Sequence, residues 1–148
     1  MEFISDLHPH ASLVPIDPLQ KARARVFASF IDTVLLQALA DTSFFGTKDI
    51  SEMYKALDFV QTQLIDDTQY AVGNDFTIAD VVAAAIFSMV EVVLSNDVGK
   101  YDEGEGLKVY EAFNSARYDK LRGYVKRILN RESVKRSIDT VSDCPCST

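Results

Sequence analysis

The stretch YAVGNDFTIADV, residues 70–81, decides how this chain folds. Thr77 is followed three residues later by Asp80, which is the spacing of an acidic capping box, where each side chain bonds the backbone N–H of the other residue. Phe76 just before the cap and Val81 at the fourth helical position have the spacing of a hydrophobic staple. The stretch therefore predicts that a helix begins here, and we assign these four residues a structural role rather than a catalytic one.

The segment after the cap, residues 78–94, is the most apolar part of the chain. It contains many β-branched residues, which favour strands, but strands rarely reach this length and the capping box favours a helix. A helix that is apolar on all sides must be surrounded by other helices. The segment is also short for a membrane span and contains Asp80 and Glu91. We therefore predict a buried central helix and no membrane-spanning segment.

Helical patterns flank this segment on both sides. Asp17-Pro18 has the composition of a helix start, and apolar residues with the spacing i, i+3, i+4, i+7 continue to about Ser43. A second pattern covers residues 48–66, and two or three amphipathic helices follow the central segment after a polar loop. No strand-rich segment interrupts them. The sequence thus predicts an all-α bundle of five to seven helices around a central helix at about residues 77–94.

Three parts of the chain resemble the C-terminal domain of the glutathione S-transferase family. Residues 70–81 resemble the loop and capping box that open the central helix of that domain, and PLQKARAR (residues 18–25) resembles the start of its first helix. Residues 124–135 resemble its late helix and the turn after it, although Glu132 stands where the family usually has proline. The first-helix and linker residues look closest to omega-like or fungal-type members. The resemblance implies a glutathione S-transferase C-terminal-like helical bundle.

Residues 3–9 resemble the end of the family's thioredoxin-like half and its exit into the interdomain linker. The resemblance therefore divides the chain into a remnant of that helix and linker (1–16), a helical domain (17–141) and a flexible tail (142–148). The thioredoxin-like half, which in the family binds glutathione and carries the catalytic Tyr, Ser or Cys, is not represented. We expect no catalytic residue and no cofactor within this chain, and glutathione only if a thioredoxin-like half is supplied.

The half that is represented shapes the pocket for the hydrophobic co-substrate in the family. The matching positions on the first predicted helix are Arg23, Val26, Phe27, Phe30 and Val34. An alternative is that the apolar members of this set belong to the core of the domain, because most apolar residues at helical spacing do. Arg23 could face a ligand or simply solvent.

Composition limits the remaining possibilities. The chain has 148 residues, with 15 Lys and Arg against 22 Asp and Glu and a net charge of −7, which fits one domain and argues against a broad nucleic-acid surface. The pairs His8/His10 and Cys144/Cys146 supply two ligands each, whereas a structural zinc site needs four, so we expect no metal site. The acids of loop 96–106 lack the alternation of a calcium loop and are expected to be solvated.

Basic residues concentrate between residues 117 and 136, where eight basic and two acidic residues give a local charge of +6. Much of this charge lies opposite an apolar stripe, so we expect a solvated outer helix face. The alternative is a docking patch for an acidic partner or for another copy of the chain. Its candidate residues are Lys120, Arg122, Lys126, Arg127 and Arg131.

Two functions are open to such a chain. The first is a non-catalytic role in dimerisation or protein–protein association, because a helical half alone exposes apolar area that a second copy or a partner protein would cover. The second is a truncated or split glutathione transferase, performing conjugation or thiol transfer, for which this chain supplies the hydrophobic substrate pocket. A carrier of apolar small molecules is a third option. The lack of a signal peptide pattern predicts a cytoplasmic protein.

Overall fold

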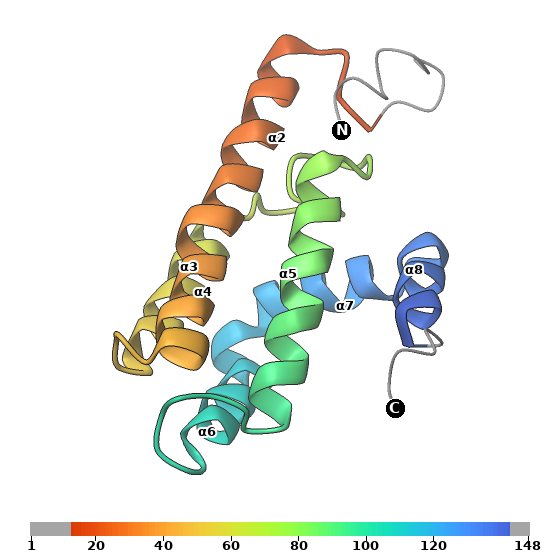
Figure 1. Cartoon of the computed structure of the whole chain (residues 1–148). Helices are drawn as coiled ribbons and strands as arrows, with labels where there is room; N and C mark the ends of the chain where they lie inside the picture. The colour runs from red at the N-terminus through yellow and green to blue at the C-terminus, as the bar shows by residue number, and fades with distance from the viewer. Residues whose placement is uncertain (1–12, 143–148) are drawn as a thin grey trace.

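The structure, a computed structural model that describes residues 13–142, consists of six helices, with the helix Ile78–Ser95 (α5) at the centre (Figure 1). The helices are the long first helix (Pro18–Phe45), α4 (Ser51–Gln63), α5 (Ile78–Ser95), α6 (Glu105–Phe113), α7 (Asp119–Leu129) and α8 (Glu132–Ser142), with one turn of 3₁₀-helix, η4 (Ala116–Tyr118), before α7. No strand occurs among the described residues. The predicted all-α class and helix count are confirmed. The remnant and the tail predicted at the two ends lie mostly outside the described residues.

The first helix begins as the sequence predicts, but its winding changes along its length. The Asp17 carboxylate caps it by accepting a hydrogen bond from Gln20 N at 2.8 Å. The helix consists of α2 (Pro18–Phe30), a π-helical stretch η2 (Ile31–Leu36), a short α3 (Gln37–Leu39) and a second π-helical stretch η3 (Ala40–Phe45). The helical periodicity of the sequence does not predict these wide turns. Because π winding bonds residue i to i+5, it rotates later side chains away from the face that an α-helix would give them.

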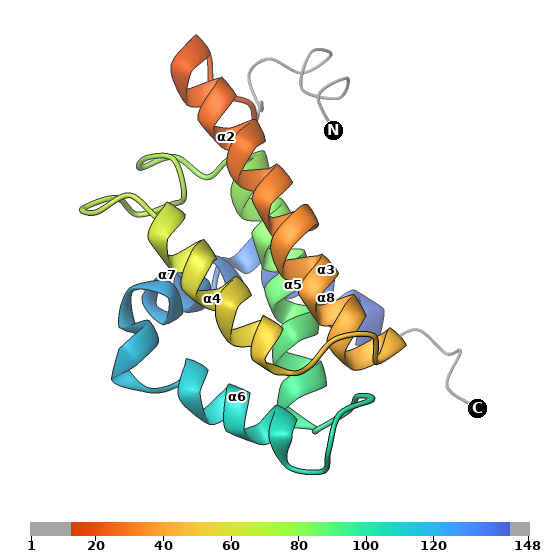
Figure 2. The same cartoon turned by 90° about the vertical axis from the view of Figure 1, so that its left-hand side faces the viewer.

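α5 is the centre of the bundle and confirms the predicted central helix. It lies between the first helix on one side and α6 and α7 on the other (Figures 1 and 2). Phe87 of α5 is fully buried, and its ring stacks on that of Phe113 in α6 with 6.2 Å between centroids. The other helices do not cover α5 completely, because Met89 and Val92 are 39% and 62% exposed.

Two helices, Pro18–Phe45 and Ile78–Ser95, are long and apolar enough to cross a membrane by length and composition alone. In the apolar window of Ile78–Ser95, 56% is buried inside the bundle, against 39% in the first helix. The core helix of a soluble protein passes the same test, and burial of α5 against its neighbours explains its composition. The two helices are therefore weak evidence for a membrane span.

The loop before α6 is more ordered than a solvated loop. Asp97 Oδ1 accepts a hydrogen bond from Gly106 N at 2.9 Å, and Oδ2 accepts one from Gly104 N at 2.5 Å, so this carboxylate holds the first turn of α6. Lys100 N donates to Ser43 O at 3.0 Å, which ties the loop to the end of the first helix. The expectation that the acids of this loop are solvated is thus wrong for Asp97, which is half-buried.

Candidate functional site

The capping box at the start of α5 is closed and completely buried. Thr77 N donates to Asp80 Oδ2 at 2.8 Å, and the Thr77 hydroxyl donates to the same oxygen at 3.0 Å. Two donors from outside the box reach Oδ1: Ala71 N at 3.0 Å and the Tyr124 hydroxyl at 2.9 Å. The fully buried Asp80 carboxylate therefore joins three parts of the fold: the loop between α4 and α5, the start of α5, and α7.

The Tyr124 phenol acts only as a hydrogen-bond donor to Asp80. Burial, followed by the charge of the neighbouring Asp80 carboxylate, raises the pKa of this phenol well above its ordinary value. It consequently stays protonated at neutral pH. The ring of Tyr124 meets the ring of Phe27 edge-on, with 6.1 Å between centroids, so one side chain contacts both the capping box and the first helix.

Phe76 and Val81, the predicted staple pair, are both half-buried. The Phe76 ring packs edge-on against Tyr70, with 5.4 Å between centroids, and the Arg131 guanidinium lies 4.3 Å from the centre of the Phe76 ring. Phe76 therefore links the loop to the end of α7 in addition to preceding the cap. A direct contact between Phe76 and Val81 stays a prediction.

An open groove of about 450 Å³ lies between α2 and the segment that leads from α4 to α5. On the α2 side, four of the five pocket residues predicted from the sequence line the groove, namely Arg23, Val26, Phe27 and Phe30. Ala22 lines it as well. The opposite side consists of residues that the sequence did not indicate: Gln63, Ile65, Ala71 and Val72.

Val34, the fifth predicted pocket residue, is not part of this groove. It lines a different hollow, between the first helix and α4. Val34 belongs to the π-helical stretch η2, which begins just after Phe30. The wider winding of this stretch means that a residue four positions after Phe30 does not stand directly above it.

The groove is apolar and has one charge at its edge. The ring of Phe30 packs edge-on against Phe59 of α4 with 5.2 Å between centroids, and Val26 is 52% exposed to the open groove. Arg23 is the only charged residue among the described residues that line it, and Gln63 is the only other polar one. Such a surface suits a flat apolar molecule that carries an anionic or hydrogen-bond-accepting group.

The groove offers a place to hold a ligand but no group to react with it. None of the described residues that line it is a Ser, Cys, Tyr, His, Asp, Glu or Lys, the side chains that serve as nucleophile or general base. Among the side chains described for residues 13–137, no three His, Cys, Asp or Glu are grouped so as to hold a metal ion.

The five residues of the predicted docking patch do not form one surface. Lys120 Nζ donates to Leu64 O at 2.6 Å, and Arg127 Nη1 donates to Gln69 O at 2.6 Å, so both lie against the loop between α4 and α5. Arg131 reaches the same loop through the Phe76 ring. These cations hold a segment of their own chain.

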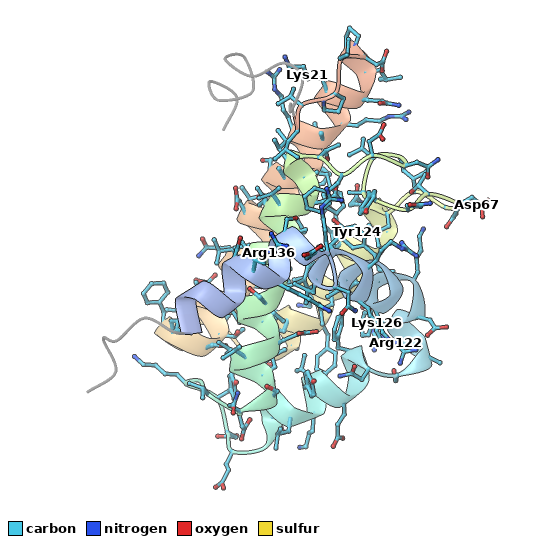
Figure 3. The ribbon with its side chains drawn as sticks, turned by 90° about the vertical axis from the view of Figure 1, so that its right-hand side faces the viewer. Lys21, Asp67, Arg122, Tyr124, Lys126 and Arg136 are labelled. Atoms are coloured by element: carbon cyan, nitrogen blue, oxygen red, sulfur yellow. The ribbon has the colours of Figure 1, made fainter. Side chains whose placement is uncertain are left out.

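The other two cations lie on the opposite side of α7. Arg122 and Lys126 lie toward α6, whereas Tyr124 lies toward the start of α5 (Figure 3). They line a polar hollow of about 730 Å³ together with Glu91, whose pKa is raised by burial. Arg122 Nη1 donates to Asn114 O at 2.5 Å. Of the five cations, Lys126 is the one whose side chain has no bonding partner among the side chains described for residues 13–137.

A helical bundle around a capped central helix, with an apolar groove beside its first helix, defines a helical domain of the glutathione S-transferase kind. The family model described as glutathione S-transferase, C-terminal domain, matches residues 47–132, which is more than half of the chain. The chain belongs to this family, and the resemblance found in the sequence is confirmed.

Known relatives extend the match over most of this chain. A probable glutathione S-transferase of Glycine max is 26% identical over 139 residues, covering 90% of this chain and 56% of the relative. The solved structure of glutathione transferase Omega 1C from Trametes versicolor is 32% identical with a TM-score of 0.84, covering 92% of this chain and 56% of that one. The solved structure of glutathione transferase Omega 2S of the same fungus, in complex with 2,4-dihydroxybenzophenone, is 31% identical with a TM-score of 0.85, covering 95% of this chain and 61% of that one. The chain thus spans somewhat more than half the length of these relatives.

Proposed function

We propose that this chain is the part of a glutathione transferase that binds the apolar ligand, and that it does not catalyse the reaction alone. The observation that carries the proposal is the groove, which has aliphatic and aromatic sides, one cation and no reacting group among its described residues. Glutathione and the group that activates it would come from a thioredoxin-like half. The location proposed for this function is the cytoplasm, where thiols are kept reduced.

The fungal Omega 2S structure supports an aromatic ligand for the groove. That protein, whose helical part resembles this chain, was solved with 2,4-dihydroxybenzophenone. The molecule has two flat rings for the apolar sides of the groove, and its phenolic hydroxyl groups can accept a hydrogen bond from Arg23. We therefore choose this hydroxybenzophenone as the probe for the groove.

The first test is calorimetric titration of the purified chain with the hydroxybenzophenone. Val26→Asp places a charge on the apolar side of the groove and is expected to weaken binding by at least about tenfold, because a carboxylate is poorly tolerated against apolar rings. Val92→Asp is the matched control: it makes the same change on α5 at a position that is 62% exposed and does not line the groove. Equal effects of the two substitutions, or no binding by the unaltered chain, would refute the groove as the ligand site.

The second test addresses catalysis. The purified chain is mixed with glutathione and an aromatic chlorodinitrobenzene, and formation of the conjugate is followed by absorbance. We expect no rate above the uncatalysed background. Turnover by the chain alone would overturn the proposal that it is non-catalytic.

A specific feature also favours an association role for the same face. Exposed apolar side chains continue from the groove along α2: Ile65, which lines the groove, is 38% exposed, and Leu19, one turn before Ala22 and Arg23, is 60% exposed. We propose that a thioredoxin-like half or a second copy of the chain covers them, because exposed apolar patches mark interaction surfaces. Sedimentation at increasing concentration tests the second copy, and a chain that stays monomeric would leave the thioredoxin-like half as the covering partner.

A further inference from the structure

The side of the groove opposite α2 has a second hollow behind part of it. This side consists largely of the irregular segment that connects α4 to α5, and Ile65, Ala71 and Val72 of this segment line the groove. A separate hollow of about 240 Å³ lies between this segment and α7, and Ile65 lines that hollow as well. The tip of the segment at Asp67 projects away from the bundle (Figure 3). Ala71 and Val72 belong to the buried core, whereas Ile65 is 38% exposed, so packed core backs only part of this side and contacts from α7 hold the rest of the segment.

One face of α7 provides those contacts. Lys120, Tyr124 and Arg127 follow the spacing i, i+4, i+7, which places them in one row along α7, and Arg131 follows at i+11, just after the helix ends. Each of the four reaches the connecting segment or the residues at its end, either directly or through Asp80. We call these four residues the clamp.

The contacts of the clamp are spread along the whole segment. Lys120 Nζ binds the backbone carbonyl of Leu64 at 2.6 Å and also pairs with Asp66 at 2.6 Å. Arg127 Nη1 binds the backbone carbonyl of Gln69 at 2.6 Å. Two of these bonds end on main-chain oxygens, so they fix the path of the segment and not only the position of a side chain.

The far end of the segment is held through the capping box and an aromatic ring. The Tyr124 hydroxyl binds Asp80 Oδ1, the same oxygen that accepts the N–H of Ala71, and Ala71 lines the groove. Arg131 lies over the ring of Phe76, which itself packs on Tyr70. The clamp therefore acts at both ends and in the middle of the connecting segment, and Tyr124 reaches the groove-lining Ala71 through Asp80.

We propose that Lys120, Arg127 and Arg131 are positioning residues that set the place of the segment 64–76 and thereby the affinity of the groove. The proposal rests on the proposed function in one respect, namely that the groove binds an apolar ligand. It assigns to these cations an internal role in place of docking to an acidic partner. Lys126, on the other side of α7, has no such role.

The experiment uses the full chain and the double variant Lys120→Met/Arg127→Met, which removes two charged donors and keeps unbranched side chains. Lys126→Met is the matched control on the same helix, because the Lys126 side chain has no partner among the side chains described for residues 13–137. Arg127→Lys tests rescue, since a lysine can still donate one hydrogen bond to Gln69 O. Two quantities are measured: amide hydrogen exchange of residues 64–76 and the dissociation constant of the hydroxybenzophenone.

In the double variant we expect exchange in residues 64–76 to be at least about fivefold faster, because hydrogen bonds from charged groups are the stronger ones. Exchange in the middle of α5 should be unchanged, and the dissociation constant should rise by about the same factor. Lys126→Met should match the unaltered chain. Arg127→Lys should bind the hydroxybenzophenone more tightly than Arg127→Met, a single variant made for this comparison.

Unchanged exchange in residues 64–76 of the double variant would overturn the clamp itself. Faster exchange with unchanged ligand affinity would overturn its control of the groove, as would equal effects from Lys126→Met. If the hydroxybenzophenone binds neither the unaltered chain nor any variant, the ligand-binding function fails and control of that affinity fails with it. The exchange data would still decide whether the clamp holds the segment.

Discussion

Replacing Tyr124 with Phe removes one hydroxyl group from the buried junction of the fold and leaves the ring in place. The lost atom donates the 2.9 Å hydrogen bond to Asp80 Oδ1. The remaining ring can keep its edge-on contact with Phe27. The substitution therefore isolates the bond between α7 and the capping box from the packing of the side chain.

The expected loss of stability follows from the surroundings of Asp80. A hydrogen bond to a charged group contributes about 1.5–3 kcal/mol. Asp80 keeps three other donors after the substitution, namely Ala71 N, Thr77 N and the Thr77 hydroxyl, so its carboxylate is not left without partners. We therefore expect the lower end of that range, about 1.5 kcal/mol.

The measurement is urea unfolding followed by circular dichroism. With a slope near 2 kcal/mol per molar urea, typical for a chain of this size, the midpoint should fall by about 0.8 M. Tyr110→Phe is the matched control, because the Tyr110 hydroxyl makes no hydrogen bond within the described residues, and its midpoint should not move. A Tyr124→Phe loss below about 0.5 kcal/mol, or one equal to that of Tyr110→Phe, would refute the reasoning.

The raised pKa of the Tyr124 phenol predicts how the stability of the chain changes at alkaline pH. The pKa of Tyr124 is higher in the folded chain than its ordinary value of 10.0, so above that pH the folded state holds a proton that the unfolded state releases. Stability is therefore fully present below pH 10 and falls as the pH rises above it. The stability of Tyr124→Phe should fall less steeply than that of the unaltered chain above pH 10, measured as the urea midpoint at each pH. Some decline should remain in the variant, because burial also raises the pKa of Tyr118.

The remaining predictions concern two residues beside the polar hollow on α7. Gly123→Ala should stabilise the chain by roughly 0.5–1 kcal/mol, because alanine favours the helix interior and a Cβ at this position meets nothing within 4 Å. A lower urea midpoint would contradict this. Burial raises the pKa of Glu91, so its ionised form is disfavoured by folding, and the penalty appears as the pH rises above the ordinary value of 4.5. Glu91→Gln should therefore raise the thermal midpoint at pH 7 and leave it nearly unchanged at pH 4; a gain of equal size at both pH values would show that charge is not the cause.

The sequence predicts features whose physical cause is local. The helix start at Thr77 depends on two residues three positions apart, and the cap at Asp17 depends on its own first turn, so both are visible in the residues themselves. Four residues of the groove were found because the first helix resembles the family's helix that lines the co-substrate pocket. Val34 follows the spacing of these residues but lies outside the groove, because the helix winds as a π-helix at that point and periodicity assumes a constant turn.

The partners of the basic residues are not predictable in this way. Lys120 and Arg127 bind backbone carbonyls that are 56 and 58 positions away. Every residue has a carbonyl oxygen, so the acceptor has no signature in the sequence. The charge pattern of the sequence therefore does not distinguish a Lys or Arg that binds a backbone carbonyl from one that is exposed to solvent. The spacing of Lys120, Tyr124, Arg127 and Arg131 is the one available signal, because it places two cations in a helical row with a tyrosine that is otherwise expected to face the core, and a third cation just after the helix.

The capping box consequently has a second role that its local pattern does not reveal. As a helix start it needs only Thr77 and Asp80, and Oδ2 of Asp80 alone satisfies that need. Oδ1 is left for Ala71 N and the Tyr124 hydroxyl, and Ala71 is part of the groove. One carboxylate therefore couples the first turn of the central helix to the side of a binding surface. A substitution at Tyr124 should loosen residue 71 and with it the groove, even though the phenol itself does not line the groove.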